Sequence, residues 1–211
     1  GVVATGEALI AVFDSGVAKT SFNTPSSLER FYSAAAMLAV LLKRARIVIK
    51  PKDVAVDVAR LLPNVDGASN ERLRLQSPIY TDTNELIAAA DLVVNMGQSS
   101  TLVEALVCGV PAIALDETGR DWTSVLARPD VLIFDNADDL YHAASEILDE
   151  GLPSDTWKDI MDRIRQNFGG ADGRAIERIR AGVLDACGRE PTANGRPTQH
   201  VGDDGWIDSG S

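Results

Sequence analysis

The sequence has 211 residues, a formal net charge of −11 and 45% hydrophobic residues. This acidic balance argues against a protein that binds nucleic acid through a general basic surface, so a bound nucleotide would need a local site. The apolar content is enough for the core of one α/β domain with a tail. No apolar run reaches the roughly 18 residues of a membrane span, and we expect a cytoplasmic protein.

The sequence contains two cysteines and two histidines. Cys108 falls in a predicted buried helix and Cys187 lies near the tail, and neither has the spacing of a metal ligand. This pattern is typical of a reducing compartment without disulfides. A histidine-based metal centre is not expected, because His200 lies in the tail.

Apolar runs of strand length alternate with segments of helical periodicity along the chain. We expect strands at Ala8–Phe13, Ile47–Ile49, Arg72–Gln76, Asp91–Met96, Pro111–Leu115 and Val131–Phe134. We expect helices at residues 26–44, 53–62, 83–90, 102–108, 137–149, 154–167 and 173–186, and a turn-rich spacer at 63–71. A capping-box pattern opens the first helix at Ser26–Glu29, and Asp82 with Glu85 opens the third.

Strands that are apolar on nearly every residue are typical of a parallel sheet covered on both faces. The predicted fold class is therefore α/β, a Rossmann-like three-layer sandwich with a mostly parallel sheet of about six strands. We assign this domain to residues 1–187. Residues 188–211 are rich in Gly, Pro, Asp and Asn, a composition that predicts a disordered tail.

A small-residue turn follows the fourth predicted strand and precedes a helix. It consists of Gly97, Gln98, Ser99, Ser100 and Thr101. Free backbone N–H groups and the helix dipole favour an anion at such a place, and phosphate is the obvious ligand. A plain helix cap explains one hydroxyl equally well. Glu104 lies in the helix that follows the turn. It could bind a ligand, or it could be a solvated acid near the first turn of the helix.

A second candidate feature is the sequence Lys50-Pro51-Lys52, which follows the second predicted strand. Proline cannot continue the ladder, so both ammonium groups could point into a crevice above the sheet. Two solvated loop lysines are the alternative. We favour anion binding by Lys50 and Lys52.

The order of these segments resembles the C-terminal, donor-binding half of GT-B fold glycosyltransferases of the surface and capsular polysaccharide type. The resemblance covers Ala8 to Leu148, and its specific part is Thr81–Pro111. The segments that carry it are Ile47–Lys52, Ile79–Val94, Asn95–Leu115 and Val131–Leu148. It implies a nucleotide-activated sugar as the donor substrate and no cofactor.

The resemblance also implies roles for the turn and its surroundings. Gly97–Thr101 would hold the donor diphosphate, and Glu104, five residues before Gly109 as in that family, would accept hydrogen bonds from the ribose. Ile79 and Tyr80 would lie against the nucleobase.

On the same grounds Lys50 and Lys52 would neutralise the leaving nucleoside diphosphate, where charge develops as the glycosidic bond breaks. Asp116 to Arg120 would face the sugar. No Asp-x-Asp pair lies in a suitable loop, so no obligatory metal is expected for donor binding, with Asp66 and the pair Asp203-Asp204 as open alternatives.

The chain departs from that family in its length, because a GT-B enzyme needs a second Rossmann domain that brings the acceptor. We therefore expect one half of an enzyme, able to bind a nucleotide but inactive without an N-terminal acceptor domain. Two alternatives stay open: half of a non-hydrolysing nucleotide-sugar epimerase or glycerophosphate transferase, and a non-catalytic binding module. The serine-rich turn favours transfer over the epimerases, which prefer glycine there.

Overall fold

The computed structural model describes residues 7–16, 24–53, 57–63, 67–97, 99–119, 121, 126, 128–168, 174, 177 and 181. The chain divides into two compact units, Gly1–Gly170 and Ala171–Ser211, and every element below belongs to the first. The domain boundary predicted at 187/188 and the helix predicted at 173–186 fall in the second unit, largely outside the described residues, and stay predictions.

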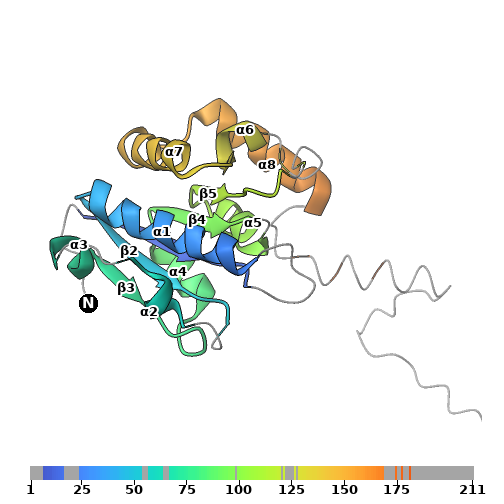
Figure 1. The fold of residues 1–211 in the computed structure, drawn as a ribbon. Coiled ribbons are helices and arrows are strands. Elements are labelled where there is room, and N and C mark those ends of the chain that lie inside the picture. The colour runs from blue at the N-terminus through green and yellow to red at the C-terminus, as the bar shows by residue number, and fades with distance from the viewer. Residues whose placement is uncertain are drawn as a thin grey trace, which may run out of the picture. The chain divides into compact units, whose positions relative to one another are not determined.

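One six-stranded sheet forms the centre of the first unit, and the predicted α/β class is confirmed (Figure 1). The strands are β1 (Ala8–Phe13), β2 (Ala45–Lys50), β3 (Leu73–Leu75), β4 (Leu92–Met96), β5 (Ala112–Leu115) and β6 (Ile133–Phe134). Their order is β3-β2-β1-β4-β5-β6, and each neighbouring pair is parallel. All the carboxyl ends of the strands therefore meet at one edge.

Helices cover both faces of this sheet. They are α1 (Pro25–Leu41), α2 (Val58–Leu61), α3 (Gly67–Arg72), α4 (Thr83–Ala89), α5 (Ser100–Val107), α6 (Pro129–Leu132), α7 (Ala137–Glu150) and α8 (Ser154–Phe168). Figure 1 shows α1 in front of the sheet and α4 and α5 behind it. Helix α1 contacts α7, whereas α5 packs on β4 and β5 and contacts α8.

The two central strands, β1 and β4, lie in the core. Ile10 and Val12 in β1 and Leu92 and Val93 in β4 are fully buried. These strands have a neighbour on each side and helices above and below, which explains why their sequences are apolar without alternation.

Helix α1 begins and ends earlier than predicted. Its N-cap is Thr24, whose hydroxyl accepts from the Ser27 N–H (3.1 Å) while Ser27 accepts from the Thr24 N–H (3.3 Å). The capping box predicted at Ser26–Glu29 is therefore wrong in its residues. Proline has no N–H to leave unpaired and is favoured in the first helical turn, so Pro25 fixes this start. The helix ends at Leu41, before Lys43 and Arg44.

Three other boundaries differ from the prediction. Within the predicted helix 53–62 only Val58–Leu61 is helical among the described residues, and the predicted spacer contains α3. Half of the predicted last strand is α6, which begins at Pro129 for the same reason as α1. Cys108 is exposed at the C-cap of α5 rather than buried, because Gly109 (φ 80°) ends the helix there.

Candidate functional site

The carboxyl edge of the sheet contains a topological switch point between β1 and β4. The chain leaves β1 for α1 on one face and leaves β4 for α5 on the other. Diverging loops of this kind open a crevice, which is where doubly wound sheets bind ligands.

Asp14 lies directly after β1 and is only 6% exposed. It accepts hydrogen bonds from the Tyr32 hydroxyl of α1, from the Gly16 N–H (2.7 Å) and from the Lys52 N–H (3.2 Å to each oxygen). Burial, and then the charge of Asp14, raise the pKa of Tyr32. The carboxylate thus joins the end of β1 to α1 and to the loop after β2.

Ser15 connects this group to β4. Its hydroxyl donates to the Met96 carbonyl, the last residue of β4, and its own carbonyl accepts from the Lys52 ammonium (3.4 Å). A Cβ on Gly16 would lie 3.4 Å from Cδ of Lys52, so the lysine stem crosses this glycine. Lys52 is therefore held over the β1/β4 switch point.

Lys50 points to a different side of the sheet from Asp14. In the parallel register Phe13 pairs with Lys50 on one side and with Asn95 on the other. Neighbouring residues in register share a face, and Asp14 faces α1 through Tyr32, so Phe13, Lys50 and Asn95 lie on the opposite face. Lys50 therefore lies on the sheet face opposite to Asp14, whereas the Lys52 side chain contacts Ser15 and Gly16 in the loop after β1.

The turn after β4 combines a buried glycine with a capping serine. Gly97 has φ of 54° and donates its N–H to Leu115 of β5 (2.7 Å). Ser99 is the N-cap of α5, and its hydroxyl accepts from the Thr101 N–H (3.2 Å). Ser99 thus has the ordinary capping role, and Gln98 lies outside the described residues.

Ser100 and Glu104 form an exposed stripe on α5. Their spacing of four places them on one side of the helix. Leu102, Ala105 and Leu106 are buried on the other side, while Thr101 is half-buried. The two predicted binding residues therefore share one accessible surface at the start of α5.

Ile79 and Tyr80 lie in the segment after β3 and are 69% and 89% exposed. Both backbone N–H groups donate to the Ser77 hydroxyl (3.3 Å). Three strand spacings separate β3 from β4, a distance of about 14 Å. These residues could share a ligand with the turn after β4 only if that ligand is elongated.

Asn95 was not predicted as a site residue. Its side chain is fully buried in β4, and within the described part of the chain neither Nδ2 nor Oδ1 has a hydrogen-bond partner. Buried amides are normally paired, so this exception requires an explanation. The signal available in the sequence was a single amide inside the apolar run of β4.

No protein-family model matches this sequence, and no curated protein matches it significantly. Solved structures do match its fold. A co-structure of S. aureus MnaA with UDP superposes with a TM-score of 0.61 at 16% identity, over 89% of this chain and 49% of that one. The spinosyn forosaminyltransferase SpnP gives 0.53 at 17% identity, over 85% and 44%. A Listeria monocytogenes protein assigned as a UDP-N-acetylglucosamine 2-epimerase gives 0.53 at 16% identity, over 88% and 47%.

The chain has the fold of one half of a GT-B protein. It spans about half the length of the structures that it matches. Among the described residues of this GT-B half, no helix is long and apolar enough to cross a membrane.

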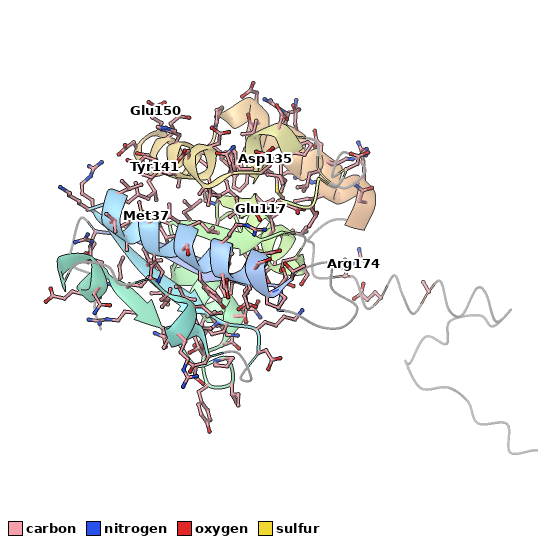
Figure 2. All side chains as sticks on the ribbon, viewed as in Figure 1. Met37, Glu117, Asp135, Tyr141, Glu150 and Arg174 are labelled. Atoms are coloured by element: carbon pink, nitrogen blue, oxygen red, sulfur yellow. The ribbon has the colours of Figure 1, made fainter. Side chains whose placement is uncertain are left out.

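The GT-B half also has an acidic cavity of about 760 Å³ beside β6. Asp116, Asp135, Asp139 and His142 are among the residues that line it, and no group in the described ranges has the arrangement of a metal site. The residue after Asp116, Glu117, is labelled in Figure 2. It pairs with Arg30 of α1 (2.5 Å), and this hydrogen bond raises the pKa of Arg30. Asp116, in the segment predicted to face the sugar, thus lines this cavity, while Arg120 lies outside the described residues.

Proposed function

We propose that the chain is the donor-binding half of a glycosyltransferase that uses a nucleotide-activated sugar in polysaccharide biosynthesis. The nucleotide lies along the carboxyl edge of the sheet, with its diphosphate at the turn Gly97–Thr101. Turnover requires a second, acceptor-binding domain.

The observation that carries this proposal is the connection between Lys52, Ser15 and the end of β4. It brings an ammonium group to the loop after β1, which contacts the end of β4, the strand that precedes α5. A helix N-terminus with a nearby cation is suited to a diphosphate, because the backbone N–H groups and the positive charge both stabilise its oxygens. The UDP bound in the MnaA structure agrees with a ligand of this class.

The remaining residues receive roles along the same edge. Glu104, exposed one turn into α5 beyond Ser100, accepts from the ribose hydroxyls. Lys50 supports the phosphates from the α5 face of the sheet. Ile79 and Tyr80 provide apolar surface for the base at the far end of an elongated ligand.

Calorimetric titration of the purified chain with UDP, CMP, CDP and GDP tests the proposal. We expect one nucleotide to bind, and Glu104→Ala and Lys50→Ala to weaken it by about tenfold each, since each change removes a charge-assisted hydrogen bond. Matched controls are Glu71→Ala and Lys43→Ala, which make the same charge changes next to the amino ends of the strands, far from the proposed site.

The outcomes separate the alternatives. Equal losses of nucleotide affinity in Glu71→Ala and Lys43→Ala would show that the effect comes from net charge rather than from contacts at the proposed site. No binding by the wild-type chain, alone or together with its acceptor domain, would favour a non-catalytic module. The match to a protein assigned as a 2-epimerase supports a second candidate, half of a nucleotide-sugar epimerase. Product analysis of the completed enzyme with several donors distinguishes epimerisation from transfer.

A further inference from the structure

Asp14 and Lys52 are joined in a way that the predicted site did not include. The Asp14 carboxylate is buried, and each of its oxygens accepts from the Lys52 N–H at 3.2 Å. The Tyr32 hydroxyl and the Gly16 N–H complete its set of donors. A buried carboxylate with this many donors is well satisfied, so its position is fixed.

Lys52 is an exposed residue whose backbone, stem and ammonium each contact the same group of residues. Its backbone is held by Asp14, its stem lies against Gly16, and its ammonium bonds to the Ser15 carbonyl. A free lysine side chain has a large rotamer entropy, and ordering it in advance lowers the cost of binding.

We propose that Asp14 is a positioning residue, which holds Lys52 in place to bind the phosphates of the ligand at the switch point. This inference rests on the proposed function and goes beyond it by separating the two predicted lysines. Lys52 is the preorganised phosphate ligand, whereas Lys50 lies on the sheet face opposite to Asp14.

The negative charge of Asp14 makes the inference sharply testable. A carboxylate close to a phosphate site repels the ligand, so removing its charge alone should leave affinity equal or higher. Asp14→Asn does this with little change of shape. Its Oδ1 can still accept from Gly16 and Lys52, and its Nδ2 can donate to the Tyr32 oxygen. Asp14→Ala removes the charge and the contacts together.

The first experiment is a double-mutant cycle, with UDP as the probe in calorimetry. We expect Lys52→Ala and Asp14→Ala each to weaken binding by about tenfold, and the double variant to be no weaker than either single one. Asp14→Asn should bind UDP at least as well as wild type. Additive losses, or a loss in Asp14→Asn equal to that in Asp14→Ala, would overturn the inference.

A second experiment does not depend on any ligand. NMR of the Lys52 CεH2 group reports whether the side chain is ordered. The CεH2 signal should match that of wild type in Asp14→Asn. In Asp14→Ala it should become the averaged signal of a mobile lysine side chain. An unchanged Lys52 signal in Asp14→Ala contradicts the positioning role. This result does not depend on ligand, so it is distinct from a failure of wild type to bind UDP, which would count against the proposed function.

Gly16→Ala is the further variant to use where Asp14→Ala does not fold. The new Cβ would make an ordinary contact with the stem of Lys52 at 3.4 Å, but the backbone φ of 69° is one that alanine adopts only with strain. Relief of that strain should shift the Gly16 N–H away from Asp14 and loosen the loop on which Lys52 lies, so UDP affinity should fall while the Asp14 side chain is intact. An ordered Lys52 signal and full affinity in this variant contradict the inference.

Discussion

The carboxylate of Asp91 accepts a hydrogen bond from the backbone N–H of Leu9 at 2.8 Å, and the Asp91 N–H donates to the Leu9 carbonyl at 2.9 Å. This pair joins the beginnings of the two central strands, β1 and β4. Asp91 lies in the segment that resembles GT-B sequences. It therefore has a structural role at the amino edge of the sheet, opposite to the candidate site. We expect Asp91→Ala to lower the free energy of unfolding by about 1–2 kcal/mol, measured by chemical denaturation.

Asp91→Asn is the control for this prediction, because its side-chain oxygen can still accept from Leu9. Its stability should lie closer to wild type than that of Asp91→Ala. Nucleotide affinity should be unchanged in both variants, and a loss of affinity at retained stability would contradict the structural role.

Ser99 and Ser100 should differ although they are neighbours. Ser99→Ala removes the N-cap of α5 and should cost about 1 kcal/mol of stability. Ser100 is exposed on the stripe shared with Glu104, so Ser100→Ala should leave stability nearly unchanged and lower nucleotide affinity several-fold. Thermal unfolding and titration of both variants test this, and equal effects on both quantities would contradict separate roles.

Asn95 should be replaceable at little cost in stability. Leucine branches at Cγ as asparagine does and brings no polar atoms to leave unpaired, which offsets the cost of its larger volume, so Asn95→Leu should stay within about 1 kcal/mol of wild type. Asn95→Ala, which leaves a void, should be destabilising. Urea unfolding of both variants provides the comparison, and a clear loss in Asn95→Leu would show that the carboxamide is hydrogen-bonded in solution.

Tyr32 should resist ionisation in the folded protein, because burial and the adjacent Asp14 raise its pKa above the usual 10. A raised pKa means that the folded state holds its proton more tightly than the unfolded state. The corresponding stability is complete below about pH 10 and is lost as pH rises further. We expect the stability advantage of wild type over Tyr32→Phe to shrink in that alkaline range. Denaturant titrations at several pH values measure it, and a constant difference would contradict the predicted shift.

The strands of this fold could be predicted from the sequence because burial on both faces leaves a continuous apolar signal. All six predicted strand regions contain a strand, and the buried run before Gly97 is the clearest. The helix boundaries depend on single capping residues, and several hydroxyls compete near each end. Thr24 caps α1 in place of Ser26 because Pro25 follows it directly.

The site could be predicted only in part. Spacing alone indicated the turn after β4 and the lysines at the end of β2. It could not indicate that Lys50 lies on the sheet face opposite to Asp14, because that depends on the register of β1 with β2. The link from Asp14 to Tyr32 and Lys52 joins residues 18 and 38 positions apart, so no local pattern contains it.

The two outer strands, β3 and β6, have three and two residues. Unpaired backbone groups on a sheet edge are a template for another chain, and very short edge strands offer few of them. This sheet therefore has a built-in protection against edge-to-edge aggregation. That property favours handling the chain on its own at the concentrations that calorimetry and NMR require.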